Sequence, residues 1–570
     1  MRFLKDMTHF SRAKSTGAAF GATSTEDAST VSQTPPSTLQ ATQSTLQATQ
    51  SSTRLAASHI AASHSKALLL LTIAAVALGE ANCFRSDVLD LGAAALLALS
   101  VAACCLGFNA LQENASSNAS TPSQKSRSKS LARLLQIVPS LTRLSVLNPW
   151  LLMLWLVLVL SQIVNAGVAL DSMLTQLKLA SWPPLVFGLL AVAGIVWSLR
   201  SPLGWWLQLL TFVGIGGWLI AHRLPEIDVF IFQHDACAAL LRGQNPYTIT
   251  FPNMYPDNSP YYGAGMSVSG RLQFGYVYMP LTLLLALPGF LLGDLRISHM
   301  AAIAISALLV AGTRPRAEKA LLGALFLWTP MVFFVLFLSW SDSFCVLTIC
   351  LVFFCARRCP AWLPVACGLF LVSKQYALLA LPLLWLLAPL TASSLPQKLA
   401  KSGISSTRWR GQNHPALFWS FLGKTLAVAA VITLPLALWD FKAFFYSTML
   451  LQFKQPFFPN SLSFMALSNR VGWGRWPWWL PFGLTLLTLV WTLRRAPRNE
   501  VGFLASVALV FLVFFAFNKQ AFVNYYYFVL GTLWCAIMAL FERSLSAQSA
   551  STTAPLATEA TPHNIPNRPI

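Results

Sequence analysis

Long apolar runs recur between residues 66 and 541, and they constrain this chain more than any other feature. Each run has roughly 17–25 residues, the length that an α-helix needs to cross a bilayer. Of the 570 residues, 55% are hydrophobic and only 10% are charged, against about 25% charged in a typical soluble domain. Lipid offers the backbone no hydrogen-bonding partner, so such a chain must form helices. We therefore predict an all-α, multi-pass membrane protein with about 14 transmembrane helices.

The net charge of +20 does not indicate a nucleic-acid partner. The basic residues form short clusters between apolar runs, as in membrane proteins that keep Lys and Arg in cytoplasmic loops. They are not interleaved with aromatic residues as in a nucleic-acid groove. The ten cysteines lie mostly within apolar runs and form no CxxC pair, so we expect neither a disulfide framework nor a metal site.

The basic clusters order the polar segments across the membrane. The clusters assigned to the cytoplasmic side are 125–143, 314–319, 357–358, 398–410 and 494–498. Counting crossings between them places five polar segments outside, namely 222–276, 340–342, 374–375, 440–474 and 518–520. This count requires the short segment 277–292, which contains two prolines, to enter the membrane and return. Both termini are then expected inside.

Composition divides the chain into four parts. Residues 1–65 are rich in Ser, Thr, Ala and Gln and contain a seven-residue direct repeat, so we expect a disordered cytoplasmic arm. Residues 66–204 are assigned to N-terminal membrane helices and residues 205–541 to the main membrane domain. Residues 542–570 are expected to form a disordered tail.

The segment from Asp228 to Tyr247 opens the longest polar loop within the membrane region. We expect a helix along the membrane surface over 228–241, ended by Gly243, with Asp228 and Asp235 close to one face. A carboxylate directly after a membrane exit can accept a proton from an alcohol. The alternative for each acid is a solvated loop residue or a helix cap.

Two short motifs in this loop resemble those of a known enzyme family. Asp228, Gly243 and the sequence Asn245-Pro246-Tyr247, followed by 276–281 (Tyr-Val-Tyr-Met-Pro-Leu), resemble the GT-C glycosyltransferases, specifically glycosyltransferase family 87. That family shows an Asp after an early membrane helix, a Gly-x-x-x-Tyr turn and a Tyr-Pro-Pro-Leu entry to the next segment. Met279 stands where the family has the first proline. The resemblance covers about residues 205–530.

The resemblance implies a GT-C-like fold with an extracytoplasmic catalytic loop. It implies transfer of a hexose such as mannose from a polyprenyl-phosphate sugar to a hydroxyl of a lipid or glycan acceptor, with inversion. Asp228 would be the general base. Such donors need no nucleotide, and we expect no cofactor. The partners would be the sugar donor, the acceptor and membrane lipid, in a cell membrane such as the bacterial inner membrane.

A lipid-phosphate leaving group calls for cations at the outer interface. Lys374 and Lys519 are the first candidates, and the alternative for each is an interfacial lysine whose charge reaches water. Further outer-face cations are Arg271, Arg296, Lys454 and Arg470. Asp342 could bind a sugar hydroxyl or be a solvated turn acid. The residues expected to contact substrate are Tyr247, Tyr278, Asp342, Lys374, Gln375, Lys519 and Asn524.

Two other classes of membrane protein compete with this interpretation. A secondary transporter would show repeated halves and charged residues near the middle of helices. The membrane region has no evident internal repeat, and Lys424 is the main central charge. A membrane protein without catalysis would leave the gathering of unusual polar motifs on one face unexplained.

Overall fold

The structure is a computed structural model that describes residues 66–81, 91–116, 161, 164–175, 177–180, 182–198, 200–256, 261–263, 265–392 and 415–552. All of them belong to one compact unit, Leu55–Ile570. The arm at 1–65, the basic clusters at 125–143 and 398–410, and most of the predicted tail lie outside the described residues.

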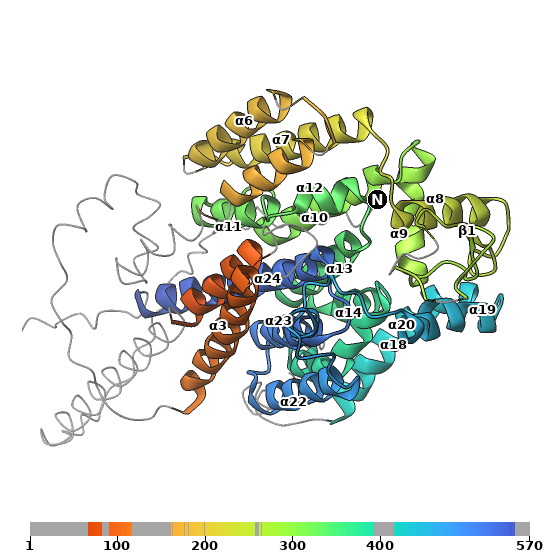
Figure 1. Cartoon of the computed structure of the whole chain (residues 1–570). Helices are drawn as coiled ribbons and strands as arrows, with labels where there is room; N and C mark the ends of the chain where they lie inside the picture. Colours follow the sequence, from red (N-terminus) through yellow and green to blue (C-terminus); the bar gives the residue numbers. More distant parts are fainter. Residues whose placement is uncertain are drawn as a thin grey trace, which may run out of the picture. The chain divides into compact units, whose positions relative to one another are not determined.

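The described chain is mostly helical (Figure 1). Before the polar loop come α3 (Leu91–Ser116), α6 (Trp182–Ser198) and α7 (Leu203–His222). From the loop onward come α8 (Asp228–Leu241), α9 (Pro280–Leu291), α10 (Arg296–Ala311), α11 (Ala317–Leu327), α12 (Val332–Phe337), α13 (Asp342–Arg358), η2 (Pro360–Trp362), α14 (Leu363–Leu371), η3 (Gln375–Leu386) and α15 (Ala388–Ala392). Then follow α18 (Pro415–Ala437), α19 (Phe441–Phe445), η4 (Tyr446–Leu450), α20 (Leu451–Lys454), α21 (Phe464–Arg470), α22 (Trp479–Arg495), α23 (Glu500–Phe517) and α24 (Val523–Thr552).

Five of the described helices are long and apolar enough to cross a membrane. They cover Gly92–Leu111, Leu203–His222, Leu417–Ala437, Glu500–Phe517 and Val523–Ser546. Helices α9 and α10 pass the same test together but are bent by 113° at the break between them. This bend lies at the end of the segment 277–292 that the charge pattern requires to turn back. The prediction of a helical membrane protein is confirmed, and the count of about 14 crossings stays a prediction.

The polar loop carries a small antiparallel sheet with strand order β1-β3-β2. The strands are β1 (Phe251–Pro252), β2 (Ser267–Val268) and β3 (Arg271–Leu272), and Leu272 pairs with Phe251 on one side and Ser267 on the other. Ser269 and Gly270 both have positive φ angles, as in the tight turns that join two strands of a hairpin. The ring of Phe251 packs 4.8 Å from that of Phe232 on α8, so the loop folds against this helix.

The largest apolar core surrounds α23 and α24, which pack closely against each other and against α13. A second, smaller core joins α8 and α9 to the loop residues 251–279. At Gly275 an added Cβ would lie 2.0 Å from the carbonyl oxygen of Tyr247, so only glycine allows these two backbones to approach. This close contact fixes the loop over the second core.

The polar segments predicted to share one face contact one another. The backbone N–H of Gly275 donates to the hydroxyl of Ser447 at 3.1 Å, which joins the first outer loop to the fourth. Lys519 donates to the carbonyl oxygen of Gln455 at 2.6 Å, which joins the fourth outer segment to the fifth. Figure 1 shows α8, β1 and α19 together at the right of the view. The gathering predicted from the charge pattern is therefore present.

Large aromatic side chains are exposed around the same group of segments. Trp473 is 84% exposed, Trp478 is 78% exposed and Phe453 is 72% exposed. Side chains of this kind favour the layer where lipid headgroups meet the hydrocarbon region. They indicate the depth at which this end of the protein meets the membrane surface.

The C-terminal end of α24 differs from the sequence prediction. Residues 542–552, which we assigned to a disordered tail, are helical. Glu542 binds Lys319 and Arg357, and Arg543 binds Glu500 at 2.7 Å, so ion pairs hold the start of this stretch against other helices. The boundary predicted between residues 204 and 205 falls inside α7 and is not a linker.

Cysteine labelling tests the predicted sides of the membrane. In a variant without reactive native cysteines, Gln273→Cys and Asn460→Cys should react with an impermeant thiol reagent in intact cells. Thr313→Cys, which lies beside the basic cluster 314–319, should react only after permeabilisation. All three side chains are exposed, so differences in burial do not confound the comparison. Labelling of Thr313→Cys in intact cells would contradict the predicted orientation.

Candidate functional site

Asp228 is the first residue of α8 and its carboxylate is held by two donors. Ile227 before it is extended, and the helix begins at the acid itself. One oxygen accepts the backbone N–H of Val229 at 2.7 Å and the other accepts the hydroxyl of Tyr262 at 2.5 Å. Burial raises the pKa of Asp228 above its ordinary value, although these hydrogen bonds partly oppose the shift. Its carboxylate is thus a stronger base than that of an exposed Asp.

The structure does not bring Asp235 into this group. Its carboxylate lies 3.0 Å from Nδ1 of the neighbouring His234, and its side chain is 41% exposed. The ring of His234 in turn packs against Phe290. The seven-residue spacing places both acids on α8, but they share no hydrogen-bonding partner.

Tyrosines line the surroundings of Asp228. Tyr255 stacks on Tyr261 with ring centroids 4.2 Å apart, and its other ring neighbour is Tyr262 at 6.0 Å. Burial, and then the negative charge of Asp228, raise the pKa of both Tyr255 and Tyr262. These phenols therefore stay protonated and can donate hydrogen bonds to the carboxylate.

A second polar group lies at the start of α13 around Asp342, whose side chain is completely buried. Its carboxylate accepts hydrogen bonds from Lys374 Nζ at 2.7 Å, from Tyr376 at 2.5 Å and from Asn524 at 2.5 Å. The interpretation of Asp342 as a solvated turn acid is therefore wrong. Lys374, 32 positions away in the chain, neutralises it, and Asn524, 182 positions away, donates a hydrogen bond to it.

Lys374 is also placed differently from an interfacial lysine. Its side chain is only 5% exposed, so the alternative, in which its charge reaches water, is wrong. The ammonium pairs with Asp342 and lies 5.1–5.4 Å from the ring centres of Tyr278, Tyr376 and Tyr525. A cation surrounded by aromatic rings and one carboxylate is stabilised without water.

Tyr278 contacts the group around Asp342 and lies near enough to Asp228 for that charge to act on its phenol. Burial raises the pKa of its phenol, and the charges of both Asp228 and Asp342 raise it further. Its ring contacts the Lys374 ammonium, and its carbonyl oxygen accepts the hydroxyl of Tyr247 at 2.9 Å. Asp228, Tyr278, Asp342 and Lys374 therefore form one neighbourhood, which we call the tyrosine-bridged site.

Gln375 lies beside this site, and Lys519 forms its own set of contacts. The amide of Gln375 donates to the carbonyl oxygen of Val277 at 3.3 Å, while its own side-chain oxygen is buried without a partner. Lys519 donates to the carbonyl oxygens of Phe453 and Gln455, and burial lowers its pKa. Lys519 therefore ties two loops together, whereas Gln375 retains a free acceptor next to the site.

The other predicted outer cations are mostly engaged in structural contacts. Arg296 is completely buried, pairs with Asp294 at 2.6 Å and donates to two backbone carbonyls near the end of α7, so it is not available to a phosphate. Arg271 donates to Thr250 at 2.9 Å. Lys454 lies 4.7 Å from the ring centre of Tyr446. Arg470 lies in the last turn of α21.

A buried polar chain that the sequence did not reveal joins α8 to α13. One ring nitrogen of His299 lies 3.0 Å from the side-chain oxygen of Gln233, and the other lies 2.7 Å from the hydroxyl of Ser343. Gln233 also donates to the carbonyl oxygen of Ser339 at 2.6 Å. Isolated polar residues within apolar runs were the available signal, and neither their partners nor those of Tyr262 and Tyr376 could be read from spacing.

Comparisons of the chain with protein-family models, with curated proteins and with solved structures give no match. Among the residues that the structure describes, no three His, Cys, Asp or Glu side chains are grouped so as to hold a metal ion. The family resemblance therefore stays a prediction, and the chemistry of the site rests on its own geometry.

A double-mutant cycle tests the buried ion pair. Asp342→Asn or Lys374→Met alone should lower the free energy of unfolding by about 3–5 kcal/mol, because each leaves a buried charge unpaired. The double variant should lose clearly less than the sum of the two, as measured by unfolding in mixed detergent micelles. Arg242→Gln, which changes an exposed charge, is the control. Strictly additive losses would contradict the pairing.

Proposed function

We propose that the protein is a membrane glycosyltransferase that uses a polyprenyl-phosphate hexose, such as mannose, as donor. The observation that carries the proposal is the tyrosine-bridged site. It combines a carboxylate of raised pKa, tyrosines suited to stacking on a sugar, and a buried cation within one neighbourhood. Two of its residues, Asp228 and Tyr278, come from the motif segments that resemble glycosyltransferase family 87.

In this mechanism an acceptor hydroxyl attacks the sugar carbon that is bonded to phosphate. The new carbon–oxygen bond forms as the bond to the phosphate oxygen breaks, and the configuration at that carbon inverts. The proton of the hydroxyl passes to Asp228, and polyprenyl phosphate leaves with the bonding electrons. The raised pKa of Asp228 brings its basicity closer to what proton transfer near neutral pH requires.

The contacts of the lysines change the role that we propose for them in binding the donor phosphate. Asp342 already neutralises Lys374, so this ammonium supplies the phosphate with a positioned hydrogen-bond donor more than with net charge. The unpartnered acceptor of Gln375 lies beside it and suits a sugar hydroxyl. Lys519 and Lys454 at the loop edge then contribute the general positive field.

The proposal includes the finer topology. About 14 crossings, with the site on the extracytoplasmic side, would place the tyrosine-bridged site where a polyprenyl-phosphate headgroup meets water. The exposed tryptophans at residues 473 and 478 support that depth. The acceptor hydroxyl belongs to a lipid or a glycan on the same side.

A secondary transporter is the second candidate, and one observation favours it. The Asp342–Lys374 pair is buried where α14 ends and the chain is extended before η3, and buried charges at helix breaks are typical of transport sites. Transport of a solute into sealed vesicles, with no sugar transfer to lipid, would support this candidate over the enzyme.

Removing the proposed base tests the enzyme. With radiolabelled polyprenyl-phosphate hexoses and membrane lipid acceptors, Asp228→Asn should lower turnover by about 10²–10⁴-fold, because the amide cannot accept the proton. Asp235→Asn should have a mild effect, since that acid lies outside the site. Wild-type turnover by Asp228→Asn would exclude the role, and loss of activity only in Asp235→Asn would assign the role to that acid.

The pH dependence gives an independent test. A general base acts only when deprotonated, so activity should fall as the pH drops through the pKa of Asp228, above the range of an ordinary Asp. Tyr262→Phe removes a hydrogen bond that lowers this pKa, so the acidic limb of the turnover–pH profile should move to higher pH. Tyr526→Phe is the control, because its hydroxyl bonds to the carbonyl oxygen of Leu462. An unmoved limb in Tyr262→Phe would contradict the assignment.

A further inference from the structure

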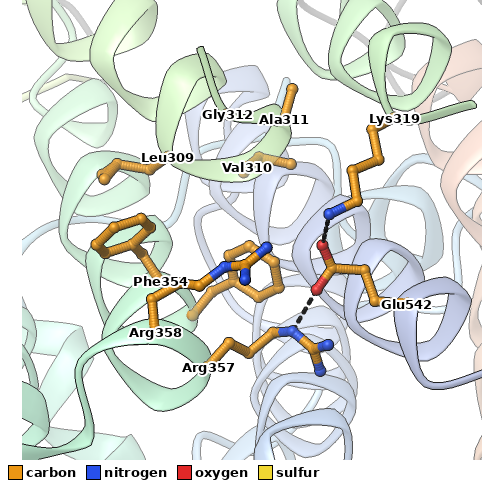
Figure 2. Close-up of a pocket in the computed structure, with 10 residues that line it drawn as sticks. Leu309, Val310, Ala311, Gly312, Lys319, Phe354, Arg357, Arg358 and Glu542 are labelled. Atoms are coloured by element: carbon orange, nitrogen blue, oxygen red, sulfur yellow. Dashed lines mark hydrogen bonds and ion pairs between the residues drawn. The ribbon is translucent and has the colours of Figure 1, made fainter. Parts of the chain in front are cut away.

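A pocket of about 50 Å³ lies among α10, α11, α13 and α24 (Figure 2). It is at the opposite end of α13 from Asp342, because this helix runs from Asp342 to Arg358. It is lined by Leu309, Val310, Ala311, Gly312, Lys319, Phe353, Phe354, Arg357, Arg358 and Glu542.

The charges at this pocket do not cancel. Its lining contains three cations and one carboxylate. The carboxylate of Glu542 is shared by Lys319 and Arg357, and Arg357 also donates to Glu500 at 2.7 Å. Glu500 in turn accepts from Arg543, so including this outer pair leaves the excess of two positive charges unchanged.

Arg358 is the cation whose guanidinium is available to bind an added anion. Lys319 and Arg357 are fixed by carboxylates, whereas Arg358 forms no hydrogen bond or ion pair with any residue that the structure describes. Figure 2 shows its guanidinium extending into the pocket near Phe354. An arginine at the end of α13 also interacts favourably with the helix dipole. The helix dipole alone does not explain why Lys319 and Arg357 also line the pocket.

The remainder of the lining is apolar and selects the class of ligand. Leu309, Phe353 and Phe354 face the same space as the cations. A guanidinium that binds an anion beside such a wall matches a phospholipid, whose phosphate is attached to acyl chains. A water-soluble anion has no apolar part that could pack against these side chains. The helices that form the pocket include α24, whose residues Val523–Ser546 are long and apolar enough to cross a membrane.

We propose that this pocket binds the phosphate of an anionic phospholipid from the leaflet bordering the basic end of α13. Arg358 contacts the phosphate, Lys319 and Arg357 supply the positive field, and the acyl chains lie toward Leu309 and Phe354. The proposal depends on the membrane location of the chain and not on sugar transfer. The lipid is a bound structural or regulatory partner and undergoes no reaction here.

Lipid retention by the purified full-length protein tests the proposal. Native mass spectrometry in detergent with added phosphatidylglycerol should show a bound lipid, and Arg358→Gln should reduce its occupancy at least several-fold. Phosphatidylcholine should bind much more weakly, because its phosphate charge is neutralised within the headgroup. Arg495→Gln is the matched control, since it also removes an exposed arginine from the last turn of a helix.

Thermal unfolding is the second test. It distinguishes a lipid phosphate from free inorganic phosphate as the bound anion. Phosphatidylglycerol should raise the Tm of the wild-type protein and not that of Arg358→Gln. Inorganic phosphate alone should have little effect. Equal lipid occupancy in wild type and Arg358→Gln would overturn the site, as would equal binding of both lipids. An Arg358-dependent rise in Tm with inorganic phosphate as large as that with lipid would assign the pocket to a soluble anion and overturn the lipid.

Discussion

The buried carboxylate of Asp342 is the constraint on which the rest of the structure depends. An ionised acid with no contact to water costs several kcal/mol unless its oxygens are fully bonded. Here the bonds come from Lys374, Tyr376 and Asn524, so the start of α13, the break before η3 and the first turn of α24 must meet at one point. Three elements far apart in the sequence are thereby fixed relative to one another.

Tyr278 relates this fixed point to Asp228, because the charges of both acids act on its phenol. Tyr278 packs over the Lys374 ammonium, and the same tyrosine begins the turn into α9. The folded polar loop brings Tyr262 onto the Asp228 carboxylate from the other side. Asp228 is therefore held against a loop that a small sheet supports. In the proposed function, this contact would orient the acid for proton transfer.

Local signals in the sequence predicted local structure well. The helix 228–241, its end at Gly243 and the interruption near 277–292 follow from capping, glycine and proline chemistry, and the structure contains all three. Long-range pairing could not be predicted in the same way. Lys374 looks like an isolated cation in apolar surroundings, yet it binds Asp342, and only the packing of the helices decides this partner. Arg296 pairs with the nearby Asp294, but its contacts with the backbone near the end of α7 could not be predicted. The ion pairs of Glu542 and Arg543 in α24 are likewise with residues distant in the sequence.

The exposed tryptophans have a consequence for how the proposed donor would arrive. If Trp473 and Trp478 lie in the headgroup layer, as the proposed function has it, the tyrosine-bridged site stays at a constant height in the membrane. A ligand with a long hydrocarbon tail is confined to the same layer and reaches the site by lateral diffusion within a plane. Encounter then depends on the number of such molecules per unit area of membrane, and the volume of the surrounding solution has no influence on it.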